Sequence, residues 1–110
     1  MTDRARIEAF LEMMSAERGS STNTLDAYGR DLLDASEYCG GALCDADGSD
    51  ISGWLQDLSR RGMAPSSQAR KLSAVRRFFR FLFEEGDRKD DPTAKVDGPK
   101  PSRVARSLRR

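Results

Sequence analysis

The feature that most constrains this 110-residue chain is the stretch at residues 65–86, PSSQARKLSAVRRFFRFLFEEG. Apolar residues recur there at helical spacing, which predicts one long helix that starts at Pro65. In a projection at 100° per residue, one side of this helix collects Leu72, Val75, Phe79, Leu82 and Phe83. A helix of about 20 residues spans roughly 30 Å. It therefore needs a core along one whole side and should be the spine of a small domain.

The other side of the same helix is cationic. It collects Ser66, Arg70, Ser73, Arg76, Arg77 and Arg80, while Lys71 lies to one side of this row. No carboxylate interrupts the row before Glu84. Solvated helix faces usually mix charge signs, because like charges at i,i+3 and i,i+4 spacing repel each other. The row therefore favours a polyanionic partner, and nucleic acid is the commonest polyanion.

The aromatic side chains divide into two groups by their place in the apolar pattern. Phe10, Trp54 and Phe79 fall on apolar stripes and are expected in the core. Phe78 and Phe81 fall on the flank of the stripe, where they are expected to cover the chain after Gly86 or to dock on a further domain.

Charge is segregated along the chain. Residues 1–59 hold 4 Lys/Arg against 12 Asp/Glu, a balance of −8, whereas residues 60–110 hold 15 against 6, a balance of +9. The net charge of +1 conceals this asymmetry. Segregation of this kind indicates a charged partner or association between unlike halves.

Composition and length predict one small helical domain. Hydrophobic residues make up 37% of the chain and charged residues 34%, and no run approaches the roughly 18 apolar residues of a membrane span. The first residues lack the apolar region of a signal peptide, so a cytoplasmic location is expected. Cys39 and Cys44 match no zinc spacing and are expected to be free, partly buried thiols.

Catalysis by this chain alone is not expected. It contains no histidine, the usual general base at neutral pH. It also lacks a Gly-rich phosphate loop and the common hydrolase motifs, and nothing calls for a cofactor.

Three further helices are expected before the long one, and no segment alternates with the period of a strand. They cover residues 3–17, residues 20–39 after a cluster of hydroxyl side chains, and residues 49–61 with Ser49 or Asp50 as N-cap and Gly62 as C-cap. The path across residues 39–49 is not predicted. Residues 1–94 form the expected domain. Residues 95–110 are expected to be an extended or disordered basic tail, either an interdomain linker or a free arm that binds nucleic acid.

Several stretches occur in the order found in one family. Residues 6–11 (RIEAFL), 23–28 (NTLDAY) with 30–32 (RDL), 66–79 (SSQARKLSAVRRFF) and 90–94 (DDPTA) resemble the N-terminal core-binding domain of tyrosine recombinases, of the bacterial Xer type. The resemblance covers residues 4–100. It implies an all-α, four-helix SAM-like orthogonal bundle that clamps one side of a recombination-site duplex.

The resemblance also implies which parts contact DNA and which partners take part. Helices two and four would face the double-stranded DNA, through Thr22, Asn23, Thr24, Ser66, Ser67, Arg70, Lys71, Ser73, Arg76, Arg77 and Arg80. The catalytic residues would belong to a C-terminal domain absent from this chain, so neither Tyr28 nor Tyr38 is expected to be a nucleophile. Other recombinase subunits in a synaptic tetramer would be further partners, with no membrane involved.

Two alternatives remain open from the sequence. The hydroxyl clusters at the starts of helices two and four can bind phosphate oxygens through free N–H groups, or can simply cap the helices. The whole bundle could instead be a protein–protein interaction module of the death-domain or SAM type, in which the acidic and basic halves of two copies pair.

Overall fold

The computed structural model describes residues 2–18, 21–94 and 96. Its helices are α1 (Asp3–Arg18), α2 (Thr22–Tyr38), α3 (Gly48–Arg60) and α4 (Pro65–Glu84), with a short 3₁₀ helix, η1 (Leu43–Asp45), between α2 and α3. The described residues contain no strand, which confirms the predicted all-α bundle. None of these helices is both long and apolar enough to span a bilayer.

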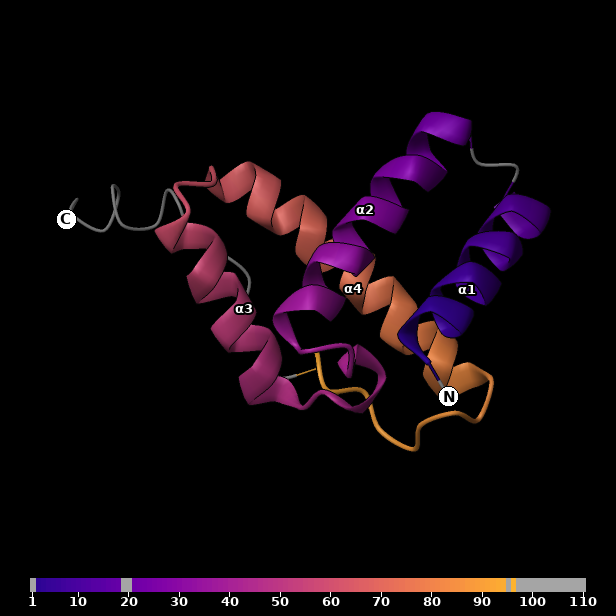
Figure 1. Cartoon of the computed structure of the whole chain (residues 1–110). Coiled ribbons are helices and arrows are strands. Elements are labelled where there is room, and N and C mark those ends of the chain that lie inside the picture. The colour runs from indigo at the N-terminus through magenta and orange to yellow at the C-terminus, as the bar shows by residue number, and fades with distance from the viewer. Residues whose placement is uncertain (1, 19–20, 95, 97–110) are drawn as a thin grey trace, which may run out of the picture.

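The helix α4 is the spine of the bundle. In Figure 1, α1 and α2 lie side by side, α3 lies on the other side of the molecule, and α4 runs obliquely behind α2. α4 contacts all three other helices. Because partners approach it from several directions, α4 buries about half of its circumference rather than one narrow stripe.

This wide contact corrects the prediction for three aromatic side chains of α4. Phe78 and Phe81, expected on the flank, are buried in the core, whereas Phe83, expected in the core, is 52% exposed. Phe10 of α1 packs edge-on against Phe78, with ring centroids 5.8 Å apart. The core predictions for Phe10, Trp54 and Phe79 are confirmed, since all three are fully buried.

Helix starts differ slightly from those expected. α3 begins after Asp47, whose carboxylate accepts a hydrogen bond from the Asp50 N–H while the Asp50 side chain accepts one from the Asp47 N–H. This reciprocal capping box makes Asp47 the N-cap, in place of the predicted Ser49 or Asp50. α4 starts at Pro65 as predicted, and Gly86 follows its last turn with a φ of 82°.

The carboxylate of Asp3 organises the path between α2 and α3. It is buried, and it accepts hydrogen bonds from the hydroxyl of Ser36 and from the backbone N–H groups of Leu43 and Cys44. The start of α1 is thereby joined to the end of α2 and to η1.

The two cysteines, Cys39 and Cys44, are free thiols, as predicted. Burial is the largest cause that raises their pKa values, to about 11 for Cys39 and about 12 for Cys44.

After α4 the chain, at residues 85–94 and 96, returns across the bundle, and we call this part the returning segment. In Figure 1 this segment runs from the end of α4 beneath η1 and toward the start of α3. Pro92, Thr93 and Val96 are buried in it. Apart from Val96, the linker predicted at residues 95–110 lies outside the described residues.

Candidate nucleic-acid interface

The exposed side of α4 carries most of the predicted row. Six residues of the predicted row are exposed to solvent: Ser66, Arg70, Ser73, Arg76, Arg77 and Arg80. Ser67 is half-buried. Because α1, α2 and α3 cover the opposite half of the helix, these side chains form a ridge on the surface, which we call the α4 ridge.

The arginines of the α4 ridge differ in how strongly the protein's own carboxylates engage them. Among the described residues, no carboxylate lies within 4.0 Å of Arg77. Arg80 pairs with Glu84 one turn away, at 3.3 Å between exposed side chains, and Arg70 lies 3.6 Å from Asp31. The exposed pair of Arg80 and Glu84 contributes only about 0–1 kcal/mol. The partner of Arg70, Asp31, is buried and lies closer to Lys71, at 3.0 Å. Most of the cationic character of the ridge is therefore available to a ligand.

Lys71 lies apart from the α4 ridge. Its side chain is only 12% exposed, and its ammonium lies 3.0 Å from Asp31 and 3.5 Å from Asp34, both on α2. Lys71 points toward α2 because it falls on the half of α4 that packs against that helix. Its positive charge balances the buried carboxylate of Asp31. Lys71 therefore joins α2 to α4 and is not presented to an external ligand.

Asp31 is a residue of this site whose role the sequence did not indicate. It is almost fully buried on α2 and contacts both Lys71 and Arg70 of α4. A buried carboxylate needs such partners, because desolvation of an unpaired charge is costly. Its place in the stretch RDL was the only signal in the sequence, and that signal carried no information about the partners.

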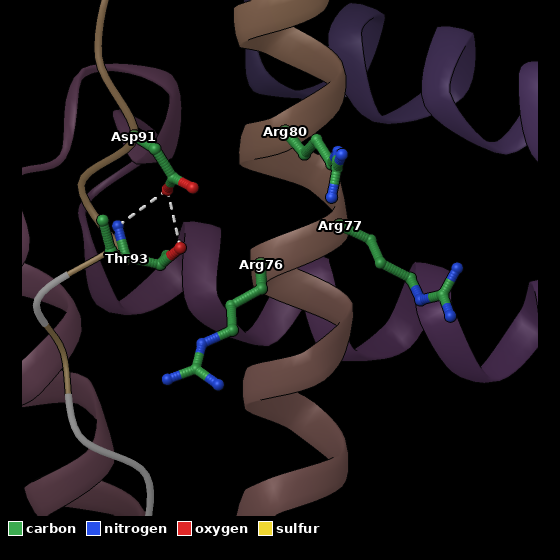
Figure 2. A pocket seen from close by; sticks show the side chains of 6 residues that line it. Arg76, Arg77, Arg80, Asp91 and Thr93 are labelled. Atoms are coloured by element: carbon green, nitrogen blue, oxygen red, sulfur yellow. Dashed lines mark hydrogen bonds between the residues drawn. The ribbon is translucent and has the colours of Figure 1, made fainter.

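Arg76 points to a different side of the α4 ridge from Arg77. Figure 2 shows Arg76 directed toward the chain at residues 91–94, and Arg77 directed away from it. A groove lies between α4 and this chain, lined by Arg76, Arg77, Arg80, Asp91, Thr93 and Ala94. In this groove Asp91 accepts hydrogen bonds from the backbone N–H and the hydroxyl of Thr93, so its carboxylate is engaged locally.

The first turn of α2 is exposed at Thr22, Asn23 and Thr24. Ser21 is the N-cap, and its hydroxyl oxygen accepts a hydrogen bond from the Thr24 N–H and lies 3.0 Å from the Thr24 hydroxyl. Ser21 therefore caps α2, and the side chains of Thr22 and Asn23 are not needed as the cap.

Further along α2, the outward face is mixed in charge. It exposes Asp26, Arg30, Leu33 and Glu37. These carboxylates would repel a phosphate backbone, so only the first turn of α2 is suited to DNA.

The first turn of α4 has no side-chain cap, and Ser66 and Ser67 stand beside its free N–H groups.

Comparison with known proteins places the chain in a family. The profile described as "Phage integrase, N-terminal SAM-like domain" matches residues 7–86, from α1 through the end of α4. The chain belongs to this family. The resemblance noted in the sequence is thereby confirmed.

Curated relatives of this integrase-type SAM-like domain are similar over most of the chain. The tyrosine recombinase XerD of Rhizobium meliloti is 52% identical over 109 residues, which cover 94% of this chain and 35% of the relative. XerD of Brucella suis is 53% identical over 105 residues, covering 91% and 34%. XerD of Caulobacter vibrioides is 50% identical over 99 residues, covering 87% and 32%. The chain thus spans about a third of the length of these relatives, and no solved structure matches it.

The region matched by the SAM-like family includes the whole α4 ridge and the first turn of α2. It ends at Gly86, whereas the fold continues through the buried residues of the returning segment. Residues 87–94 and Val96 are therefore packed on the family domain, although they lie beyond the family's profile.

Proposed function

We propose that this chain is the DNA-binding module of a site-specific tyrosine recombinase and that it clamps one side of a duplex. The observation that carries the proposal is the α4 ridge, in which Arg77 has no carboxylate partner among the described residues. Arg80 has only the exposed Glu84, and Arg70 lies 3.6 Å from Asp31, whose closer partner is Lys71. Guanidinium groups on an exposed helix suit phosphate oxygens and the guanine edge in the major groove.

In this proposal the α4 ridge supplies the main contact, through Arg70, Ser73, Arg77 and Arg80. Ser66 and Ser67 at the start of α4, and Thr22, Asn23 and Thr24 at the start of α2, would place backbone N–H groups and hydroxyls near phosphates. The start of α4 would then add donors at the end of the ridge that Arg70 occupies.

The module itself would not cleave DNA. Its relatives are tyrosine recombinases about three times as long, and we propose that a C-terminal catalytic domain supplies the chemistry. Residues 1–94 would be the binding domain and residues 95–110 the linker to that domain. Other subunits in a synaptic tetramer would be further partners, and the protein would act in the cytoplasm, where its DNA lies.

The proposal predicts that Arg77→Ala combined with Arg80→Ala weakens duplex binding. Each cation removed from a phosphate forfeits one counterion-release contribution, so we expect affinity to fall about 10–50-fold at about 0.1 M salt. The measurement is fluorescence anisotropy of a labelled mixed-sequence duplex titrated with the full chain.

Arg60→Ala combined with Lys89→Ala is the matched control, because it removes two exposed cations that lie outside the α4 ridge. We expect less than a threefold change for this variant. Equal losses in both variants would show that net charge alone, and not the α4 ridge, attracts the duplex. Concentration-dependent self-association without DNA affinity would favour the interaction-module alternative.

A further inference from the structure

The segment that follows α4 is held to the bundle first by Arg88. Its Nη1 donates hydrogen bonds to the backbone carbonyls of Cys44 at 2.9 Å and Ala46 at 2.7 Å, and its other guanidinium nitrogens bond both oxygens of Asp90 at 3.0 Å. The guanidinium also lies over the ring of Phe79, 5.2 Å from its centroid. Arg88 thus fixes the beginning of the returning segment on η1 and α4.

The end of the segment is packed as well. Pro92 lies so close to the start of α3 that a Cβ at Gly48 would stand 3.2 Å from the Pro92 carbonyl oxygen. Beyond it, the N–H of Ala94 donates to the Asp91 carbonyl and the N–H of Val96 to the Thr93 carbonyl, both at 3.1 Å. The Val96 side chain is buried in the core.

The last described residue is held from α4. Arg76 donates a hydrogen bond from Nη2 to the carbonyl oxygen of Val96 at 2.7 Å. This is a short, charge-assisted bond to a neutral acceptor, so it holds the backbone without neutralising the arginine. Arg76 therefore has a specific task inside the domain, which Arg77, one residue further and directed to the other side of α4, does not share (Figure 2).

We propose that Arg76 is a positioning residue that fixes where the chain leaves the bundle, and that it is not a principal DNA contact. This inference rests on the proposed function in one respect: the part that follows Val96 would lead to a catalytic domain. A carbonyl anchored on α4 would set the departure of that part relative to the helix that meets the duplex. The DNA-facing helix and the exit of the chain would then form one rigid unit.

The test compares Arg76→Met with Arg77→Met in the full chain. Methionine keeps most of the aliphatic stem and removes the charge and every donor. The two variants therefore differ only in which guanidinium is removed: the one that bonds Val96, or the one on the other side of α4. Hydrogen exchange detected by NMR would be followed at the amides of Ala94 and Val96, with the buried α3 residue Leu55 as internal reference.

For Arg76→Met we expect exchange at Ala94 and Val96 to accelerate at least about tenfold, with Leu55 unchanged and duplex affinity reduced less than threefold. For Arg77→Met we expect exchange at both amides to stay within about twofold and affinity to fall about tenfold. Arg76→Lys, which keeps a cation and a donor on a shorter reach, should give exchange rates between those of the wild type and Arg76→Met.

Unchanged exchange at Ala94 and Val96 in Arg76→Met would overturn the inference, as would a loss of duplex affinity equal to that of Arg77→Met. Failure of the proposed function looks different. If neither variant changed duplex affinity, the DNA-binding role would fail, while the exchange rates would still decide whether Arg76 holds the exit of the chain.

Discussion

Replacing Phe78 with alanine is expected to lower the free energy of unfolding by about 3–5 kcal/mol, the usual cost of truncating a buried aromatic side chain. Phe78 is fully buried and packs against Phe10 and Phe79, with ring centroids 5.8 and 5.7 Å away. Alanine would leave a cavity where α1 meets α4, and that contact supports the α4 ridge from behind. Urea denaturation followed by circular dichroism measures the loss.

Phe83→Ala is the matched control for this prediction. It removes the same side chain from the same helix, but from a position that is 52% exposed. We expect a loss below about 1 kcal/mol, because little apolar surface is uncovered. Similar losses for the two variants would contradict the arrangement of α4 described above.

Replacing Asp3 with asparagine is expected to lower the free energy of unfolding by about 2–3 kcal/mol at neutral pH. The Asp3 carboxylate accepts three hydrogen bonds in a buried site, and bonds to charged groups contribute about 1.5–3 kcal/mol. An asparagine keeps one acceptor oxygen but turns an NH₂ group toward donors. Asp26→Asn, on the exposed face of α2, should change stability by less than about 0.5 kcal/mol.

The same carboxylate makes stability depend on pH. Burial raises the pKa of Asp3, but the hydrogen bonds from Ser36, Cys44 and Leu43 together outweigh it and hold the pKa below its usual value of 3.8. The folded state therefore binds this proton less readily than the unfolded chain. The stabilisation is complete above about pH 4–5 and is lost as pH falls through the lowered pKa.

The asparagine variant should lack this part of the acid sensitivity. In urea denaturation at pH 7 and at about pH 3, the gap between wild type and Asp3→Asn is expected to narrow at the lower pH. A gap that stayed constant, or widened, would mean that the Asp3 carboxylate does not lose its role on protonation.

Helix content and the core of this domain were predictable from apolar periodicity, whereas the exact orientation of α4 was not. The periodicity of Leu72, Val75 and Leu82 located the centre of the buried side to within about a quarter turn. It did not show that α4 has three helical neighbours, and this is why Phe78 and Phe83 exchanged their expected environments. Lys71 was expected to one side of the row and lies there, but the periodicity did not show that Asp31 and Asp34 of α2 would engage its ammonium.

The connections were least predictable, because contacts distant in sequence determine them. The carboxylate of Asp3 holds Leu43 and Cys44, some forty positions away, and Arg88 holds the carbonyls of Cys44 and Ala46. No local pattern encodes such pairs. Their buried backbone groups nevertheless need partners, and these two long-range side chains provide them.

The cationic side of α4 could be predicted from charge and spacing alone, but the task of each arginine could not. The row from Arg70 to Arg80 is exposed as expected. Its members nevertheless differ: Arg76 bonds a backbone carbonyl, Arg80 pairs with Glu84, and Arg77 has no carboxylate partner in the part of the chain that the structure describes. These differences depend on the folded positions of α2 and the returning segment.

The most direct test of the account is the salt dependence of duplex binding. If Arg70, Arg77 and Arg80 neutralise three phosphates, the logarithm of the association constant should fall with the logarithm of salt concentration at a slope of about −2.7. Replacing all three with alanine should bring that slope close to zero. A wild-type slope no steeper than about −0.5, or one that the triple variant leaves unchanged, would contradict the assignment of the α4 ridge as the surface that binds DNA.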